Sequence, residues 1–174
     1  MSLMPPFNFN AWIEENRPLL KPPVANKCVY SGGTFIVMVV GGPNERTDFH
    51  VNQTDEFFYQ IHGNIFLRII NSDKKVEEIK IKEGEVFMLP AGTPHSPQRP
   101  EEGSVGLVVE LTRPVESRDA LQWYCAKCTN LLYQETFYLE NIETQFGSVF
   151  EKYFGSEHEA CKKCGHQNGK IWNP

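Results

Sequence analysis

The stretch from residue 28 to residue 113 is a series of short apolar segments separated by turn-forming residues, and this pattern restricts the fold more than any other feature. The segments are rich in β-branched and aromatic residues, and Gly, Pro, Asn or Asp lies between them. They are TFIVMVVGG (34–42), EFFYQIHG (56–63), IFLRII (65–70), VEEIKIKEG (76–84), EVFMLP (85–90) and VGLVVELTRP (105–114). Such a pattern is typical of a β-sandwich or barrel, so we predict a mainly β domain with turns at residues 71–75 and 83–85.

The segments before and after this stretch have different residue patterns. Before it, NFNAWIEENRPLL (8–20) predicts a short helix with Asn10 as its N-cap and an end near Pro18. After it come a strand-like segment, LLYQETFYL (131–139), a helix-like segment, IETQFGSVFEKYF (142–154), and several cysteines. We therefore expect an N-terminal helix and lead-in (1–27), one main domain (28–115) and a small C-terminal extension (116–174).

Charge and hydropathy exclude several classes of partner. The net charge is −5 and no block of lysine or arginine stands out, so the chain has no electrostatic footprint for nucleic acid or anionic lipid. No apolar run reaches the roughly 18 residues that a membrane span needs. The first residues have no basic segment followed by an apolar stretch, so we expect a cytoplasmic protein that acts on a small molecule. The exposed edges of an open sandwich favour a homodimer.

Four of the five cysteines form two C-x-x-C pairs. Cys125 and Cys128 lie in CAKC, and Cys161 and Cys164 lie in CKKCG. Four thiolates can surround one metal tetrahedrally, and such a closed site holds a segment together without offering a substrate a vacant position. Tetrahedral sulfur ligation suits Fe and Zn equally, so the sequence predicts a structural metal of either kind. Cys28 is expected to be a small buried apolar residue.

His50, Glu56 and His95 form a second candidate metal-ligand set. His50 and Glu56 flank VNQTD, so both can reach one metal across a short turn. In GEVFMLPAGTPH (84–95), a glycine begins a strand and a Pro-x-Gly turn ends it, which directs the final histidine inward. Two imidazoles and one carboxylate are the set that leaves open positions on a ferrous ion. A stiff frame suits a ligand whose direction has to be fixed to within about half an ångström.

The two segments resemble the two motifs of the cupin superfamily, a His…Glu…Gly segment followed by Gly…Pro-x-Gly-x-x-His. This resemblance implies a double-stranded β-helix, or jelly-roll barrel. Two positions depart from the general pattern: Asn52 stands where many cupins have a second histidine, and Arg99 stands where asparagine is common. The site therefore resembles the subset of cupins with two histidines and one glutamate.

A narrower resemblance covers nearly the whole chain. FNFNAWIEENRPLLKPPV, VVGGPNERTDFH, EFFYQIHGN, HSPQRP, WYCAKC and the final C-x-x-C-G are similar to the 3-hydroxyanthranilate 3,4-dioxygenase family, in its short form with a rubredoxin-like tail. The resemblance implies a non-haem Fe(II) enzyme that opens the ring of 3-hydroxyanthranilate with O2. Its product would be 2-amino-3-carboxymuconate semialdehyde, the precursor of quinolinate and so of NAD. By position it implies iron ligands His50, Glu56 and His95, an O2 site at Arg46, and substrate contacts from Glu56, Arg99 and Glu110.

Some alternatives remain open at this point. An arginine suits an aromatic carboxylate through its bidentate fork, and Arg99 follows His95 by only four residues. Glu110 lies in the apolar GLVVELT, where strand alternation alone allows either an outward position or a buried one with a partner; the family resemblance favours the buried one. A ligand-binding cupin without turnover and a metal-dependent cupin isomerase are the two other classes of function.

Overall fold

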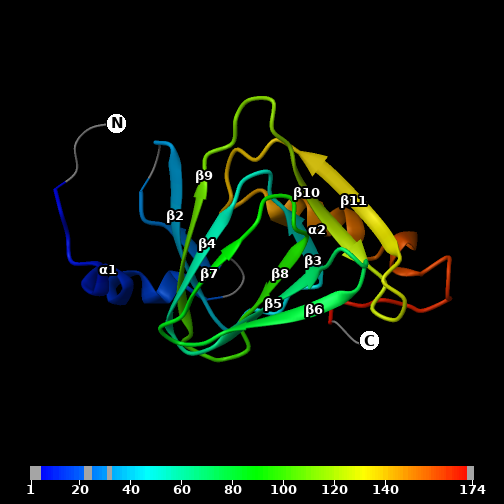
Figure 1. Ribbon diagram of the computed structural model, residues 1–174, viewed down its shortest axis with the longest axis horizontal. Helices are drawn as coiled ribbons and strands as arrows, with labels where there is room; N and C mark the ends of the chain where they lie inside the picture. Colours follow the sequence, from blue (N-terminus) through cyan, green and yellow to red (C-terminus); the bar gives the residue numbers. More distant parts are fainter. Residues whose placement is uncertain (1–4, 22–24, 31–32, 172–174) are drawn as a thin grey trace.

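The computed structural model describes residues 5–21, 25–30 and 33–171, and it places two antiparallel sheets face to face (Figure 1). Within these residues, the first sheet has the order β1-β2-β9-β4-β7, formed by Asn26–Cys28, Phe35–Gly41, Val105–Leu111, Glu56–His62 and Val86–Leu89. The second has the order β11-β10-β3-β8-β5-β6, formed by Leu131–Phe137, Asp119–Tyr124, Asp48–Val51, His95–Gln98, Ile65–Ile70 and Val76–Ile81.

The strand order is that of a jelly roll. Strands β2-β9-β4-β7 face β3-β8-β5-β6, and the first strand of this set of eight pairs with the last. Successive strands alternate between the two sheets, except β5 and β6, which form a hairpin within the second sheet. This confirms the predicted mainly β cupin fold. All the segments expected to be strands between residues 34 and 114 are strands, while β1, β3, β8 and β10 were not predicted.

The core fills the space between the two sheets. Alternate residues of each strand point inward, so Met38, Phe58 and Val108 of the first sheet meet Leu67 and Ile81 of the second. These side chains are at most 3% exposed, and the Phe58 and Val108 pair lies between the polar pair Glu56 and Glu110 and the level of Gln60. The level of Glu56 and Glu110, on adjacent strands, holds the candidate metal ligands.

A short helix covers part of the outer face of the first sheet. Helix α1 (Phe9–Asn16) is followed by a 3-10 turn (Arg17–Leu19), and buried Ile13 packs with Val39 on the face of β2 opposite the core. The predicted helix is confirmed, but its predicted cap was wrong. The Asn8 side chain accepts a hydrogen bond from the Ala11 backbone N–H at 2.9 Å, so Asn8 is the N-cap and the helix begins two residues earlier than expected.

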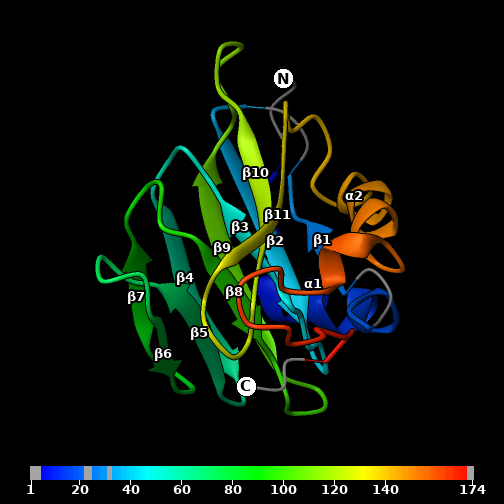
Figure 2. The ribbon, with the colours of Figure 1, turned by 90° about the vertical axis from the view of Figure 1, so that its right-hand side faces the viewer.

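The second sheet continues beyond residue 115. Strand β10 pairs with β3, and β11 pairs with β10, so both extend this sheet past the edge of the barrel (Figure 2). Helix α2 (Phe146–Tyr153) covers the face that this leaves open, packing Val149 and Tyr153 against Leu121 and Trp123 of β10. A second 3-10 turn (Glu157–Glu159) leads to the last cysteines. In the part of the chain that the structure describes, no helix is long and apolar enough to cross a bilayer.

Candidate metal centre

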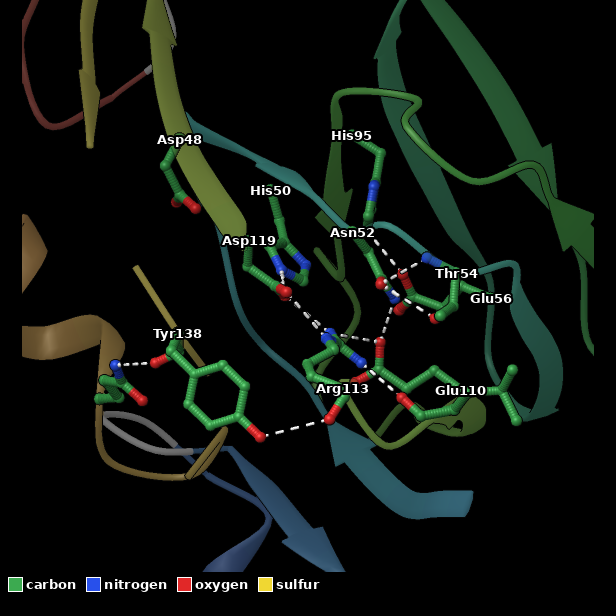
Figure 3. Close-up of polar contacts among 12 residues, drawn as sticks. Asp48, His50, Asn52, Thr54, Glu56, His95, Glu110, Arg113, Asp119 and Tyr138 are labelled. Atoms are coloured by element: carbon green, nitrogen blue, oxygen red, sulfur yellow. Dashed lines mark hydrogen bonds and ion pairs between the residues drawn. The ribbon is translucent and has the colours of Figure 1, made fainter. Parts of the chain in front are cut away.

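The structure brings His50, Glu56 and His95 together, as the sequence predicted (Figure 3). One ligand atom from each lies within 4.8 Å of the other two, and all three side chains are buried. His50 on β3 is the direct cross-strand partner of His95 on β8, with ring centroids 5.4 Å apart. Glu56 begins β4 in the facing sheet, so the three residues meet across the inside of the barrel.

Two turns fix the positions of these ligands. The Asn52 side chain accepts a hydrogen bond from the Thr54 N–H at 2.9 Å, which closes the turn between His50 and Glu56. The backbone carbonyl oxygen of Asn52 also accepts a hydrogen bond from the Gly92 N–H at 2.7 Å. Gly92 has a φ of +74°, a conformation that favours glycine. The Pro-x-Gly turn before His95 is therefore tied to the turn after His50. Asn52, at the position of a second histidine in many cupins, acts here as a structural link.

The hydrogen bonds of the two histidines leave one nitrogen of each ring available. His95 Nδ1 lies 3.0 Å from the Thr93 carbonyl oxygen, which can only accept, so Nδ1 carries the hydrogen and Nε2 has the lone pair. His50 Nε2 lies 2.7 Å from Asp119 Oδ2, so Nδ1 has the lone pair in that ring. Glu56 Oε2 lies 3.0 Å from His95 Nε2 and has no hydrogen-bond partner. This donor set fits a divalent cation.

Electrostatics favour the ionisation states that a metal requires. Burial lowers the pKa of His50, which keeps its ring neutral. Burial alone would raise the pKa of Glu56, but the neighbouring His95 and His50 rings and the Arg113 guanidinium lower it instead. Burial opposes the charging of His95, yet the Glu56 carboxylate raises the His95 pKa. A metal would take the place of that proton between the two side chains.

A buried network of charges that sequence reasoning missed supports this centre. Arg113 donates from Nε to Asp119 Oδ1 at 2.8 Å, and from Nη2 to Asp119 Oδ2 at 2.7 Å and Glu110 Oε2 at 3.0 Å. Glu110 therefore points inward, as the family resemblance implied, and it is the cross-strand partner of Glu56. Burial raises the pKa of Glu110 to about 8, and the nearby Glu56 charge acts in the same direction. The alternation of Asp119, Leu121 and Trp123 on one strand face was the available signal.

Arg46 lies beside the metal ligands. Its guanidinium donates from Nε to Asp48 Oδ1 at 3.0 Å and lies 5.5 Å from the centre of the Phe146 ring. That ring is in turn 5.2 Å from the His50 ring, so Phe146 from helix α2 covers both residues. Burial opposes the charge on Arg46, but Asp48 and Glu56 together raise its pKa, which keeps the guanidinium positive.

Arg99 is buried at another level of the barrel. It is 1% exposed and donates from Nη1 to Gln60 Oε1 at 3.0 Å. Gln60 lies four residues after Glu56 on β4, about 13 Å along the strand, so the guanidinium that contacts Gln60 lies at a different level from the metal ligands. The structure does not place Arg99 against Glu110. No described residue forms an ion pair with Arg99, and burial lowers its pKa to about 10.

The four paired cysteines also come together, as predicted. Cys125 Sγ lies 3.5 Å from Cys164 Sγ, and Cys128 Sγ lies 3.7 Å from Cys161 Sγ, without disulfides. Each pair sits on a tight turn in which a backbone N–H returns to the first cysteine carbonyl, from Thr129 at 2.9 Å and from Gly165 at 2.8 Å. The arrangement is suited to holding one metal ion.

A hollow of about 810 Å³ opens between strands β1 and β2 and residues 138–143. Half-buried Cys28 lines it, and burial raises the pKa of this thiol to about 11. The three candidate metal ligands are not in its lining, but Arg113 is, and the Arg113 guanidinium contacts Asp119 beside His50. Arg113 therefore separates the hollow from the metal centre.

Comparisons with known proteins identify the family of this chain. The family model described as 3-hydroxyanthranilic acid dioxygenase matches residues 1–154. A 3-hydroxyanthranilate 3,4-dioxygenase of Xanthomonas euvesicatoria is 50% identical over 165 residues, 94% of this chain and 92% of its own length. One of Lodderomyces elongisporus is 46% identical over 175 residues, covering 100% and 98%. A cupin-2 domain protein of Shewanella frigidimarina aligns with a TM-score of 0.47 at 20% identity, over 60% of this chain and 93% of that one. The chain belongs to the 3-hydroxyanthranilic acid dioxygenase family.

Proposed function

We propose that the chain is a non-haem Fe(II) dioxygenase that converts 3-hydroxyanthranilate and O2 to 2-amino-3-carboxymuconate semialdehyde, with both oxygen atoms entering the product. The observation that carries this is the buried set of His50, Glu56 and His95, in which each histidine has one nitrogen committed to a protein oxygen and one left for a metal. Family membership supports the substrate. The semialdehyde is the precursor of quinolinate in NAD synthesis from tryptophan.

Each side chain at the site has a distinct task in this proposal. His50, Glu56 and His95 hold the ion, and Fe(II) bound there would supply open positions at which substrate and O2 can meet. Arg46 is positively charged and lies beside Glu56, and we assign it to the O2 side of the site. Glu56 and Glu110 present carboxyl oxygens on adjacent strands, where they can accept hydrogen bonds from the amino and hydroxyl groups of the substrate.

The charge pattern of the arginines supports Arg99 as the reader of the substrate carboxylate. Arg46 is neutralised by Asp48, and Arg113 is neutralised by Glu110 and Asp119. Arg99 has no carboxylate partner among the described residues, although it is buried. A buried cation without a counterion favours an anionic ligand, and a benzoate group supplies one with the planar geometry that the guanidinium fork matches. The Arg99 side chain has to turn from Gln60 toward the substrate.

The second metal, the assembly and the location complete the proposal. Cys125, Cys128, Cys161 and Cys164 would hold one Fe or Zn ion with a structural role, because a site of four thiolates is closed. We also propose a cytoplasmic homodimer. Its support is the exposed Val86 and Met88 on the edge strand β7, which a second copy could cover. The division into residues 1–27, 28–115 and 116–174 remains a prediction.

Oxygen uptake with 3-hydroxyanthranilate tests this function. The Fe(II)-loaded chain should consume one O2 per substrate and release a strongly absorbing semialdehyde that cyclises to quinolinate. Exchanging His50, Glu56 or His95 for alanine should abolish uptake together with iron at this site, since only three protein ligands hold it. Binding without uptake would indicate a ligand-binding cupin, and conversion without uptake an isomerase. Normal activity of any of these variants with iron still bound would contradict the ligand assignment.

A further inference from the structure

We propose that Asp119, held in place by Arg113, is a positioning residue for the metal ligand His50; this rests on the metal-dependent function proposed above. Asp119 Oδ2 lies 2.7 Å from His50 Nε2. Arg113 donates two hydrogen bonds to the same carboxylate, with Nε 2.8 Å from Oδ1 and Nη2 2.7 Å from Oδ2. The carboxylate is therefore fixed by a fork on one side and fixes the imidazole on the other (Figure 3).

The strand register explains why Asp119 reaches this ligand. Leu121 on β10 is the direct partner of His50 on β3, and Asp119 lies two residues before Leu121, on the same face of the strand. Asp119 is 0% exposed and His50 is 4% exposed. Water therefore does not compete for the contact between them, and the side chains have little room to adopt another arrangement.

Arg113 links the two sides of the metal centre. Its Nη2 also lies 3.0 Å from Glu110 Oε2, and Glu110 is the cross-strand partner of Glu56 in the other sheet. The Arg113 guanidinium thus connects Asp119, which contacts His50, to Glu110, which lies beside Glu56. Since Arg113 and Asp119 come from the segment after the last barrel strand, this segment completes the support of the site.

The contact has a chemical consequence for His50. A hydrogen bond from Nε2 to a carboxylate fixes the tautomer and direction of the ring, and it makes the free Nδ1 a stronger donor to a metal. Removing such a partner typically weakens metal binding by about 10-fold to 100-fold. The effect should be confined to this centre, because the four-cysteine site has no contact with Asp119 among the described residues.

Loss of Co(II) from the fully loaded full-length chain to a competing chelator tests this role. Thiolate-bound Co(II) has sulfur-to-metal charge-transfer bands, so the two sites are followed separately in one sample. Asp119→Asn keeps the size of the side chain but removes its charge. It should weaken Co(II) binding at the His50 site by about 10-fold to 100-fold and shift its ligand-field spectrum, with the four-cysteine site unchanged.

Two further variants make the outcome decisive. Gln122→Ala is the matched control, because Gln122 lies on the same strand but its side chain contacts Gln134 and Tyr124 and neither metal site; it should change neither site. Arg113→Lys keeps the charge but loses the fork, and should weaken the His50 site less than Asp119→Asn does. If Asp119→Asn does not fold, Co(II) binding by Arg113→Lys tests the positioning role instead. Unchanged binding and spectra in the folded variant would overturn the positioning role alone.

If the His50→Ala variant binds Co(II) as tightly as the parent chain does, the proposed function is overturned as well. The two failures are therefore distinguishable, since the first appears only in the Asp119 and Arg113 variants and the second appears in the comparison of the parent with His50→Ala.

Discussion

Replacing Arg99 should impair the reaction of 3-hydroxyanthranilate far more than that of 2-aminophenol. The second compound keeps the amino and hydroxyl groups but lacks the carboxylate. Burial without a counterion lowers the pKa of Arg99 to about 10. Relative to an ordinary arginine, the charged form is therefore disfavoured by about 3 kcal/mol, at about 1.36 kcal/mol per pKa unit. A substrate carboxylate that pairs with Arg99 could recover most of this, so Arg99→Met should lower kcat/KM for the carboxylated substrate by roughly two orders of magnitude.

The assay compares kcat/KM for both substrates in Arg99→Met and Arg99→Ala, at matched iron content. Methionine fills much of the space of the arginine stem, so the difference between the two variants separates loss of charge from loss of packing. Arg68→Ala is a control, since Arg68 lies on the same sheet and pairs with Glu78 near the surface; it should affect neither substrate. Equal slowing of both substrates by Arg99→Met would show that Arg99 supports the fold or the metal, and would refute the carboxylate assignment.

Two further predictions concern the cysteines. Cys125→Ser should remove the second metal and make the C-terminal extension the first site of limited proteolysis, because metal binding supplies folding energy to a segment with little core of its own; metal analysis that gives the same content in parent and variant would contradict it. Cys28 should resist alkylation at pH 8, since a pKa raised to about 11 leaves roughly one thiol in a thousand as thiolate. Its labelling rate, measured by mass spectrometry, should rise with pH up to about 11, and fast labelling at neutral pH would show that the thiol is not shielded.

The strands that sequence reasoning found and missed differ in a physical way. The predicted ones are continuous apolar or alternating runs, such as residues 65–70, which two-residue periodicity reveals directly. Strand β8 contains a proline and is only four residues long, and β3 contains Asp48 and His50, so both have weak strand propensity. They are strands because the long neighbours β5 and β10 pair with them, which is tertiary information.

The metal ligands of the candidate site could be predicted because each lies in a short motif that combines a suitable ligand residue with a neighbouring turn. His50, Glu56 and His95 are confirmed as neighbours for that reason. The support from Arg113 and Asp119 was not predictable, because it depends on which strand lies beside β3, and chain order does not reveal that neighbour. The same limit applies to Arg99, whose four-residue distance from His95 indicates the same strand face but not the level of the barrel at which its guanidinium lies.

Strand β10 has a consequence for any attempt to shorten this chain. It carries Asp119 at one end, against His50, and leads directly into Cys125 at the other. A minimal catalyst that stopped at residue 115 would keep all three ligands of the first metal and lose the carboxylate that holds one of them. The extension is therefore not a detachable accessory, and a designer who removes it has to build a substitute anchor for His50 into the barrel itself.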